Sequence, residues 1–366
     1  MIVPPDAQPV EPSLNVAVVG LGYWGPNLIR NLHELPIVDR IVGCDLVSAR
    51  LEFVSRRFPG VTVTTSYDEV LADPTIDAVV VATQISTHHR LAAAALEAGK
   101  HVLVEKPLAA SSEQALSLIA LAEEGGLVLM PGHTFLYSSP VSMVRSLIES
   151  GEVGDIYFVS TSRVNLGLHQ SDVSVAWDLG PHDFSILRHW LDEQPARVSA
   201  LARGCIIPDV PDVAFVDLEY ASGTVGHVEL SWLAPSKLRR TTIVGSRKMI
   251  VYDDTSPNEP VRVFDSGAAL RDPETFGEFT LSYRTGDILS PHVEVAEPIH
   301  RELEDFCAAV VTGSTPRSCS ALGLDVVRTI EAVDASLANG GIRVKIPSDA
   351  PTRAEVLDPG PLPAGP

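Results

Sequence analysis

Three glycines near the start of the chain have the spacing of a dinucleotide-binding turn. The apolar run Val16–Val19 leads directly into Gly20, Gly22 and Gly25, which spells G-x-G-x-x-G at the end of a predicted strand and the start of a predicted helix. In such a turn the first glycine permits the tight bend, the second lets a pyrophosphate approach the backbone, and the third lets the helix pack on the strand. The pattern alone is weak, because a glycine-rich turn that binds nothing has the same spelling.

An acidic residue at the end of the next predicted strand strengthens this interpretation. Asp45 follows Gly25 by 45 − 25 = 20 residues, and a carboxylate there can accept both ribose hydroxyls and repel a 2′-phosphate. We therefore predict NAD binding, while Arg50, which could pair with the extra phosphate, keeps NADP open. The predicted cofactor contacts lie at the ends of predicted strands or in the segments that follow them: Gly20, Gly22, Tyr23, Trp24, Gly25, Asp45, Thr83, His88, Glu105 and Lys106.

A lysine stands at the carboxyl end of a later predicted strand, Val102–Glu105. Ligands of parallel sheets bind beyond that edge, and Pro107 keeps Lys106 out of helical geometry. An ammonium group there could donate to a substrate hydroxyl and favour the transition state in which hydride leaves the carbon. The alternative is a surface lysine paired with Glu105, which would be the better interpretation of an isolated Glu-Lys-Pro.

Asp178 and His182 are four residues apart, a spacing that places two side chains on one face of a helix. Pro181 suits a first helical turn better than an interior one, so the pair could instead span a loop–helix junction. An imidazole titrates near neutral pH and can take a hydroxyl proton, while a neighbouring carboxylate could orient the ring or bind a substrate hydroxyl. The alternative is a polar helix start with no catalytic role.

In this order, the glycine turn, Asp45, Glu105-Lys106-Pro107 and the Asp178–His182 pair resemble the glucose–fructose oxidoreductase/inositol dehydrogenase (Gfo/Idh/MocA) family, from about Asn15 to Ile346. The resemblance implies a nicotinamide cofactor and oxidation or reduction of a sugar or cyclitol carbon. It places Lys106 beside the reacting carbon, with Asp178 and His182 across from it. Many members carry a glycine run before the Asp. Here residues 173–177 read Val-Ser-Val-Ala-Trp, a spelling that resembles the branch acting on UDP-linked N-acetylated sugars and their uronic acids.

Further substrate contacts are expected from seven polar, basic or aromatic residues, of which His133 and Tyr137 lie near the junction of the two predicted domains. They are His133, Tyr137, Arg163, Asn165, Trp177, Arg239 and Arg240. Trp177 could form a flat wall against a sugar ring or fill the core. The two arginines at 239 and 240 could hold a diphosphate, or lie on an outer sheet face or a subunit interface. His133 and Tyr137 could equally satisfy buried backbone groups, and Arg163 and Asn165 end the first strand of the second predicted domain and could reach the cleft between these domains.

The elements that must position these residues fall into two patterns. Short apolar runs alternate with helical patterns between Asn15 and Pro131, which predicts a doubly wound parallel α/β sheet, the Rossmann fold. The runs are Val16–Val19, Ile41–Asp45, Ala78–Ala82, Val102–Glu105 and Val128–Met130. Helix capping boxes are expected at Ser66–Glu69 and Ser111–Gln114.

After about Gly151, strand patterns follow one another closely and predict an α+β domain with a large, open, mostly antiparallel sheet. The strand runs are Ile156–Asn165, Val213–Tyr220, Thr224–Leu233, Arg240–Val244 and Met249–Tyr252, and helical patterns return at Pro298–Val311 and Gly323–Leu337. We predict a flexible tail over 1–13, an NAD(P)-binding domain over 14–135, and a substrate and oligomerisation domain over 136–347 onto which the C-terminal helices dock. A second flexible tail is expected over 348–366.

Composition limits the classes of function. The 366 residues suit two domains, and 45% of them are hydrophobic. The net charge of −20, from 27 Lys and Arg against 47 Asp and Glu, disfavours nucleic acid and anionic membranes as partners. The four cysteines lack the spacing of a zinc or redox site, and no metal is expected. No signal peptide or membrane span is evident, so we predict a cytoplasmic protein, a homo-oligomer in line with the family resemblance.

The sequence therefore predicts an NAD-dependent dehydrogenase that oxidises a secondary hydroxyl of a sugar ring, at carbon 3 of a nucleotide-linked sugar such as a UDP-N-acetylhexosamine or its uronate. An inositol or free-sugar dehydrogenase is the second enzymatic interpretation, and a keto-sugar reductase would use the same residues. A dinucleotide-sensing regulatory protein is the alternative outside enzymes. Regulatory members tend to lose the lysine or the histidine, and this chain keeps Lys106 and His182.

Overall fold

The computed structural model describes residues 13–167, 169, 173–271 and 280–348. The predicted tails, 1–13 and 348–366, lie outside these residues except for Ser13 and Ser348. The chain divides into two compact units. The first runs to Tyr137 and also includes Ala296–Val327, and the second consists of Ser138–Val295 and the chain from Arg328 onward.

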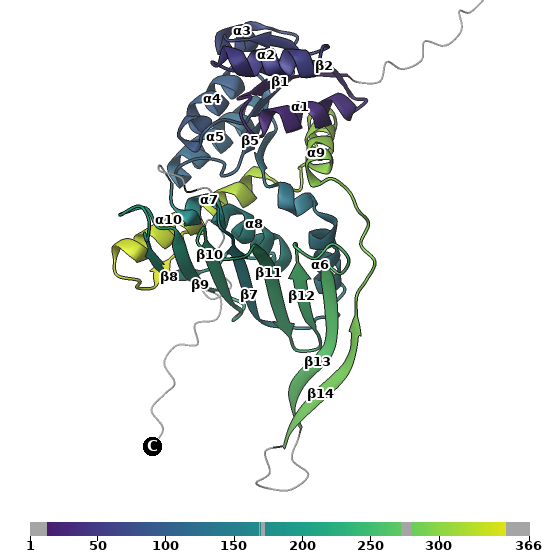
Figure 1. The fold of residues 1–366 in the computed structure, drawn as a ribbon, viewed down its shortest axis with the longest axis vertical. Helices are drawn as coiled ribbons and strands as arrows, with labels where there is room; N and C mark the ends of the chain where they lie inside the picture. Colours follow the sequence, from purple (N-terminus) through teal and green to yellow (C-terminus); the bar gives the residue numbers. More distant parts are fainter. Residues whose placement is uncertain (1–12, 168, 170–172, 272–279, 349–366) are drawn as a thin grey trace, which may run out of the picture. The chain divides into compact units, whose positions relative to one another are not determined.

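The first unit contains a six-stranded parallel sheet in the order β3-β2-β1-β4-β5-β6 (Figure 1). Its strands are β1 (Leu14–Val19), β2 (Val38–Cys44), β3 (Thr62–Thr64), β4 (Ala78–Val81), β5 (His101–Glu105) and β6 (Leu129–Gly132). The helices that connect them are α1 (Gly25–Glu34), α2 (Ser48–Arg57), α3 (Tyr67–Ala72), α4 (Ile85–Glu97) and α5 (Ser112–Gly125), and the 3₁₀ helix η1 (Thr134–Tyr137) follows β6. The predicted Rossmann sheet is confirmed, with β3 as a strand that the apolar runs did not predict.

The helix starts of this unit follow the predicted caps. The Ser66 hydroxyl accepts the Glu69 N–H at 3.2 Å, and the Ser111 hydroxyl accepts the Gln114 N–H at 3.2 Å. In a full capping box the side chain three residues later also accepts the backbone N–H of the capping serine, and in both helices this side chain has a different partner. The Glu69 carboxylate accepts the Thr64 hydroxyl at 2.6 Å, so it ties α3 to the end of β3 instead of closing back on Ser66.

Helix α9 (Pro298–Thr312) belongs to the first unit, although it lies about 160 residues further along the chain than η1. It buries Leu303 and Phe306, and two of its carboxylates bind the segment that follows β6. Glu302 accepts the Thr134 hydroxyl at 2.8 Å, and Asp305 accepts the Tyr137 hydroxyl at 2.7 Å. Helix α10 (Ser320–Ala338) is divided between the two units after Val327.

The second unit contains a nine-stranded sheet in the order β14-β13-β12-β11-β7-β10-β9-β8-β15. The strands are β7 (Ile156–Val164), β8 (Arg197–Arg203), β9 (Val213–Glu219), β10 (Val225–Ser231), β11 (Leu238–Gly245), β12 (Met249–Asp253), β13 (Val261–Arg271), β14 (Thr280–Leu289) and β15 (Val344–Lys345). All neighbouring pairs are antiparallel except β7 and β10. The predicted mostly antiparallel sheet is confirmed, and the central parallel pair is a feature that the sequence did not reveal.

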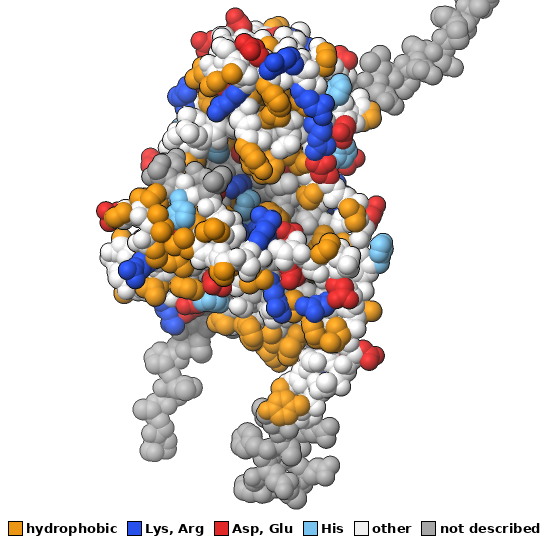
Figure 2. All heavy atoms as spheres, in the orientation of Figure 1, with side chains coloured by type: hydrophobic (Ala, Val, Ile, Leu, Met, Phe, Trp, Pro, Cys, Tyr) orange, Lys and Arg blue, Asp and Glu red, His pale blue; other side chains and the backbone are white. Residues whose placement is uncertain are grey.

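One face of this sheet is covered and the other is open. The described helices of the unit are α6 (Ser139–Glu149), α7 (Val175–Asp178), α8 (Gly180–Leu191) and the part of α10 from Arg328 onward. Residues alternate between buried and exposed along β9 and β10, as expected for a sheet with one solvated face. Leu201 and Phe215, opposite each other on β8 and β9, are exposed on the open face, and Figure 2 shows apolar side chains gathered over these strands.

Candidate active site

The candidate site residues divide between the two units, so each half is described by itself. In the first unit the glycine turn follows β1 and opens α1. A Cβ on Gly20 would lie 2.5 Å from the Ala82 carbonyl oxygen, and one on Gly25 would lie 2.4 Å from the Gly20 carbonyl oxygen. A Cβ on Gly22 would meet no atom within 4 Å. The first and third glycines are therefore required by the fold, while the second faces open space.

The start of α1 suits an anion. No side chain caps the helix, its first turn holds no acidic residue, and Pro26 occupies the start, where an N–H group would have no helical partner. The unsatisfied N–H groups and the dipole of such a helix end attract a phosphate. Tyr23 is 84% exposed, and its ring meets the Trp24 ring edge-on at 5.4 Å between centroids. Together with the open space above Gly22, these features fit a dinucleotide pyrophosphate.

Asp45 lies directly after β2 and is buried. Its carboxylate accepts the Leu21 N–H at 2.7 Å and the Val47 N–H at 2.8 Å, and the Arg50 guanidinium lies 3.2 Å away. The carboxylate therefore joins the end of β2 to the glycine turn, a structural role that the sequence analysis did not foresee. A carboxylate has about four acceptor positions, and the two backbone N–H groups together with the Arg50 guanidinium, which contacts both oxygens at 3.5 and 3.2 Å, take them up, so ribose hydroxyls would bind here in place of Arg50.

Lys106 follows β5 with a cis peptide bond to Pro107, and its N–H donates to the Glu105 carboxylate at 3.3 Å. The ring of His88 on α4 reaches two backbone carbonyls, with Nδ1 2.9 Å from the Pro107 oxygen and Nε2 3.1 Å from the Thr83 oxygen. Burial, aided by the charge of Lys106, lowers the pKa of His88. Because a neutral imidazole has a single N–H, His88 donates to one of these two carbonyls, and its ring is held against the turns after β4 and β5 from within the core.

His133, directly after β6, is 1% exposed, and neither of its ring nitrogens has a hydrogen-bond partner among the described residues. Burial and the charge of Lys106 lower its pKa to about 3, so the ring is neutral at physiological pH. Burial and the charge of Glu105 raise the pKa of Glu302 well above its ordinary value. By contrast, Tyr137 is satisfied by Asp305 and by the Ser318 N–H at 3.1 Å, so its hydroxyl serves the fold of the unit.

In the second unit Asp178 ends α7 and His182 lies in the first turns of α8. Leu179 between the helices has helical dihedrals (φ −92°, ψ −35°), and the His182 N–H donates to the Leu179 carbonyl at 3.2 Å. The chain is therefore helical on both sides of the junction, with Pro181 in the first turn of α8. This geometry places Asp178 and His182 about one helical turn apart, as their spacing predicts.

Three residues that the sequence analysis did not single out, Trp232, His169 and Asp212, form a chain of contacts that begins at Asp178. The Trp232 indole N–H donates to the Asp178 carboxylate at 3.0 Å. The His169 ring packs against Trp232 at 5.4 Å between centroids, and its Nε2 lies 3.8 Å from the Asp212 carboxylate. Trp232 lies inside a predicted strand with no motif around it, so the sequence held no signal for this contact.

Arg163 forms a buried ion pair with Asp183. Its guanidinium binds the Asp183 carboxylate on α8 at 2.5 and 3.3 Å, both side chains are almost fully buried, and the Thr161 hydroxyl donates to the same carboxylate at 3.0 Å. Arg239 pairs with Arg163 across β11 and β7 and binds Asp254 at 3.0 Å. Because successive residues of a strand face opposite sides, Arg240 lies on the other face, so the geometry does not favour a joint grip of both arginines on one diphosphate.

Of the remaining predicted contacts, Trp177 has a side-chain partner and Asn165 is held through its backbone. The Trp177 indole N–H donates to Asp334 at 2.6 Å, and the Asn165 backbone N–H donates to the Ser231 carbonyl at 3.1 Å. Asn165 therefore follows β7 beside the end of β10. Because parallel strands end at the same edge, the segments after these two strands meet there, and this edge carries Trp232 and His169.

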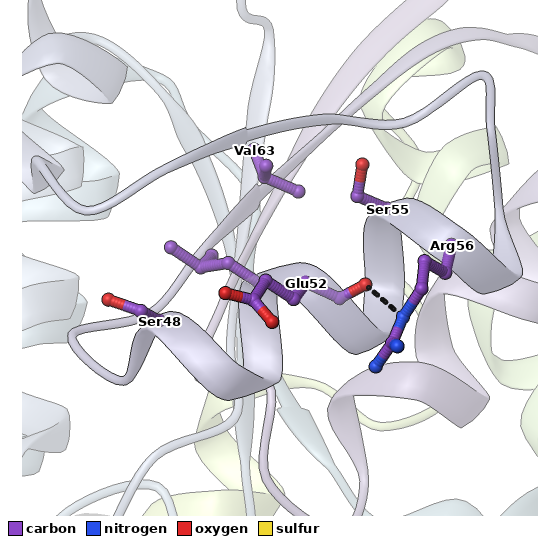
Figure 3. Close-up of a pocket in the computed structure, with 6 residues that line it drawn as sticks. Ser48, Glu52, Ser55, Arg56 and Val63 are labelled. Atoms are coloured by element: carbon purple, nitrogen blue, oxygen red, sulfur yellow. Dashed lines mark hydrogen bonds between the residues drawn. The ribbon is translucent and has the colours of Figure 1, made fainter.

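A pocket on the first unit lies between α2 and β3 and contains none of the predicted cofactor contacts (Figure 3). It is lined by Ser48, Leu51, Glu52, Ser55, Arg56 and Val63. The Arg56 Nε donates to the Glu52 carbonyl at 3.3 Å, within α2 itself. Among the residues with described positions, no group of three or more His, Cys, Asp or Glu is arranged to hold a metal ion. No helix in the described part of the chain is both long and apolar enough to cross a bilayer.

Comparison with known proteins identifies the class of protein. Residues 14–133 match the model of the "Oxidoreductase family, NAD-binding Rossmann fold" of Gfo/Idh/MocA proteins, and residues 141–251 match the Gfo/Idh/MocA C-terminal domain. The fold and these matches define an NAD(P)-dependent oxidoreductase with a Rossmann domain. The chain belongs to the Gfo/Idh/MocA family, as the motifs predicted.

Individual relatives agree with this assignment. The chain is 29% identical over 239 residues to the scyllo-inositol 2-dehydrogenase (NAD(+)) of Bacillus subtilis, covering 62% of this chain and 69% of the relative. The structure of GenD2 from gentamicin A biosynthesis in complex with NAD has a TM-score of 0.78 at 28% identity, covering 95% of this chain and all of that one. UDP-N-acetylglucosamine 3-dehydrogenase GnnA from Acidithiobacillus ferrooxidans shares the fold, with a TM-score of 0.74 at 22% identity, covering 88% of this chain and 99% of that one.

Proposed function

We propose that the protein oxidises a secondary hydroxyl of a sugar ring with NAD, at carbon 3 of a nucleotide-linked sugar such as a UDP-N-acetylhexosamine or its uronate. The observation that carries the proposal is that Lys106 directly after β5, Asp178 at the end of α7 and His182 in the first turns of α8 are all present in a chain of this family. A member that only senses the dinucleotide has no need of both the ammonium and the imidazole.

The chemistry divides between the cofactor and the chain. NAD, when bound, accepts the hydride from the carbon that bears the hydroxyl. His182 takes the hydroxyl proton, so the alcohol loses one hydride and one proton and becomes a ketone. Lys106 donates to the same oxygen while negative charge develops on it, and Asp178 orients the substrate hydroxyl or the imidazole. The same residues serve the reverse reduction of a keto-sugar.

NAD is proposed over NADP because of Asp45. A carboxylate in this position favours free ribose hydroxyls, and its attachment to the Leu21 N–H fixes it beside the turn. Arg50 is half-exposed and already faces Asp45, so its charge is partly neutralised there. Titration with NAD⁺ and NADP⁺ tests this choice, and tighter NADP⁺ binding would overturn it.

An inositol or another free polyol is the second candidate substrate, favoured by the 29% identity to the scyllo-inositol dehydrogenase. The two candidates are separated by measuring NADH formation with UDP-N-acetylglucosamine, its uronate, free N-acetylglucosamine and myo-inositol. The proposal expects the highest kcat/KM with a UDP-linked sugar. Preference for myo-inositol would replace the nucleotide-sugar assignment by the second candidate.

We also propose that the protein is cytoplasmic and forms a homo-oligomer. The exposed apolar residues Leu201 and Phe215 on the open sheet face support a subunit contact, because burial of such a face on association is favourable. Sedimentation of the purified protein tests the oligomer, and a monomer at all concentrations would contradict it.

A further inference from the structure

We infer that Trp232 is a positioning residue that holds the Asp178 carboxylate in its working orientation through the indole N–H. This inference rests on the proposed function, in which Asp178 acts beside His182. It adds a residue that no sequence motif identifies and that the proposed reaction does not itself use.

The hydrogen bond is the first ground for the inference. The Trp232 Nε1 lies 3.0 Å from the Asp178 Oδ2, and the tryptophan side chain is 2% exposed. An indole nitrogen is only a donor and does not titrate in the physiological range, so it faces the carboxylate with a proton at every working pH. A hydrogen bond to an ionised acceptor is stronger than one between neutral groups, particularly away from water.

The backbone of Trp232 is fixed on both sides, which makes the indole a rigid support. Its N–H donates to the Asp212 carbonyl at 2.9 Å, and its carbonyl accepts the Gly167 N–H at 3.0 Å. These bonds tie the residue to the start of β9 and to the segment that follows β7. The indole therefore projects from the edge where the parallel strands β7 and β10 both end.

The surroundings of the indole show that the neighbouring segment is adapted to it. A Cβ on Gly167 would lie 3.1 Å from the Asn165 Nδ2 and 3.2 Å from the Trp232 Cδ1, so a side chain there would press on the ring and shift one of these neighbours by a few tenths of an ångström. His169 packs on the same indole with its ring tilted by 58°. The indole that donates to Asp178 therefore belongs to a residue fixed by two backbone hydrogen bonds, and its ring packs between Gly167 and His169.

A structural role alone predicts something different from a positioning role. A core tryptophan would affect the stability of the unit when it is changed, with no selective effect on the chemical step. A positioning tryptophan affects kcat when its N–H is lost, because Asp178 then samples other rotamers, while the affinity for NAD, held by the first unit, is unchanged.

The test compares Trp232→Phe with Trp190→Phe. Trp190 is a second buried tryptophan of the same unit, and its indole donates to the Val141 carbonyl at 2.9 Å, so the control also loses one indole hydrogen bond. With NAD⁺ and whichever of UDP-N-acetylglucosamine or myo-inositol the wild type oxidises, we expect kcat of Trp232→Phe to fall by about tenfold or more at unchanged NAD Kd. The kcat of Trp190→Phe should stay within about twofold of the wild type.

A second measurement does not depend on turnover. In ¹H–¹⁵N spectra the Trp232 indole resonance, assigned by its loss in Trp232→Phe, should shift upfield in Asp178→Ala, while the Trp190 resonance stays in place. An unmoved Trp232 resonance would overturn the inference, as would equal kcat in the two tryptophan variants. A wild type that oxidises none of the sugars overturns the proposed function first, and the positioning role falls with it.

Discussion

Substitution of Gly22, the second glycine of the turn, should weaken cofactor binding without destabilising the fold. Gly22 does not adopt the left-handed backbone region, and a Cβ there would meet no atom within 4 Å. Gly25, three residues later, has no such room, because its Cβ would lie 2.4 Å from the Gly20 carbonyl oxygen. We therefore compare Gly22→Ala with Gly25→Ala.

The two substitutions should have opposite effects. Gly22→Ala should leave the free energy of unfolding of the cofactor-free protein within about 0.5 kcal/mol of the wild type, because the methyl group meets no atom in the folded protein, and the restriction of the unfolded chain by alanine acts in the stabilising direction. Its methyl group would occupy the approach of the pyrophosphate, and the loss of even one phosphate hydrogen bond of about 1.5–3 kcal/mol weakens binding by about tenfold or more. Gly25→Ala should cost about 1–3 kcal/mol of stability, because the backbone must shift to admit the methyl group.

Thermal unfolding without cofactor and fluorescence titration with NADH measure the two effects. Gly22→Ala is expected to match the wild-type unfolding temperature and to bind NADH more weakly. The reasoning is refuted if Gly22→Ala binds NADH like the wild type, because the pyrophosphate would then not cross this residue.

Three further predictions concern ionisable groups. Because the folded-state pKa of His133 is about 3, below the ordinary value of 6.5, its protonation favours unfolding, and stability should fall by about 1.4 kcal/mol per pH unit below about pH 6.5. In denaturant titrations, His133→Gln should remove about 2 kcal/mol of the decrease in unfolding free energy between pH 6.5 and pH 5. His33→Gln, a change at an exposed histidine, is the control. If His133→Gln leaves this decrease unchanged, the burial of a neutral ring is contradicted. Asp183→Asn should lower the free energy of unfolding in the same assay by about 3–5 kcal/mol, because the buried Arg163 charge then lacks its carboxylate partner. A decrease below about 1 kcal/mol would argue against a buried Arg163–Asp183 ion pair. Asp45→Asn should lower the preference for NAD⁺ over NADP⁺ in binding titrations, and an unchanged ratio would show that another residue sets it.

Local patterns predicted most of the first unit. The apolar runs, the glycine turn and the capping serines at 66 and 111 depend on neighbours within a few residues, and the structure has them where the sequence placed them. Strand β3 was missed because Thr62-Val63-Thr64 is three residues long and mostly polar. A run that short has too few side chains to show a period.

Long-range contacts could not be predicted from spacing. The return of α9 to the first unit depends on pairs such as Tyr137–Asp305, and the support of Asp178 comes from Trp232, 54 residues away. No periodicity connects residues so far apart in the chain. The parallel pairing of β7 with β10 is hidden for the same reason, since either direction of pairing gives the same alternation along each strand.

The arginines at 239 and 240 illustrate a different limit. Their closeness in sequence suggested one basic site, but strand β11 sends neighbouring side chains to opposite faces. Arg239 therefore joins Asp254 on the side of Arg163, while Arg240 lies on the open face. The predicted strand began at Arg240 and left out Arg239, so the period of two was not applied to this pair.

The central claim is that His182 takes the proton released as the sugar hydroxyl is oxidised. Its most direct test is the rate of NADH formation by His182→Asn under saturating NAD⁺ and sugar, with NADH affinity measured on the same sample. We predict that the rate falls by at least a hundredfold (about 10²–10⁴ for loss of a general base) while NADH binds as in the wild type. A rate near that of the wild type would contradict the account.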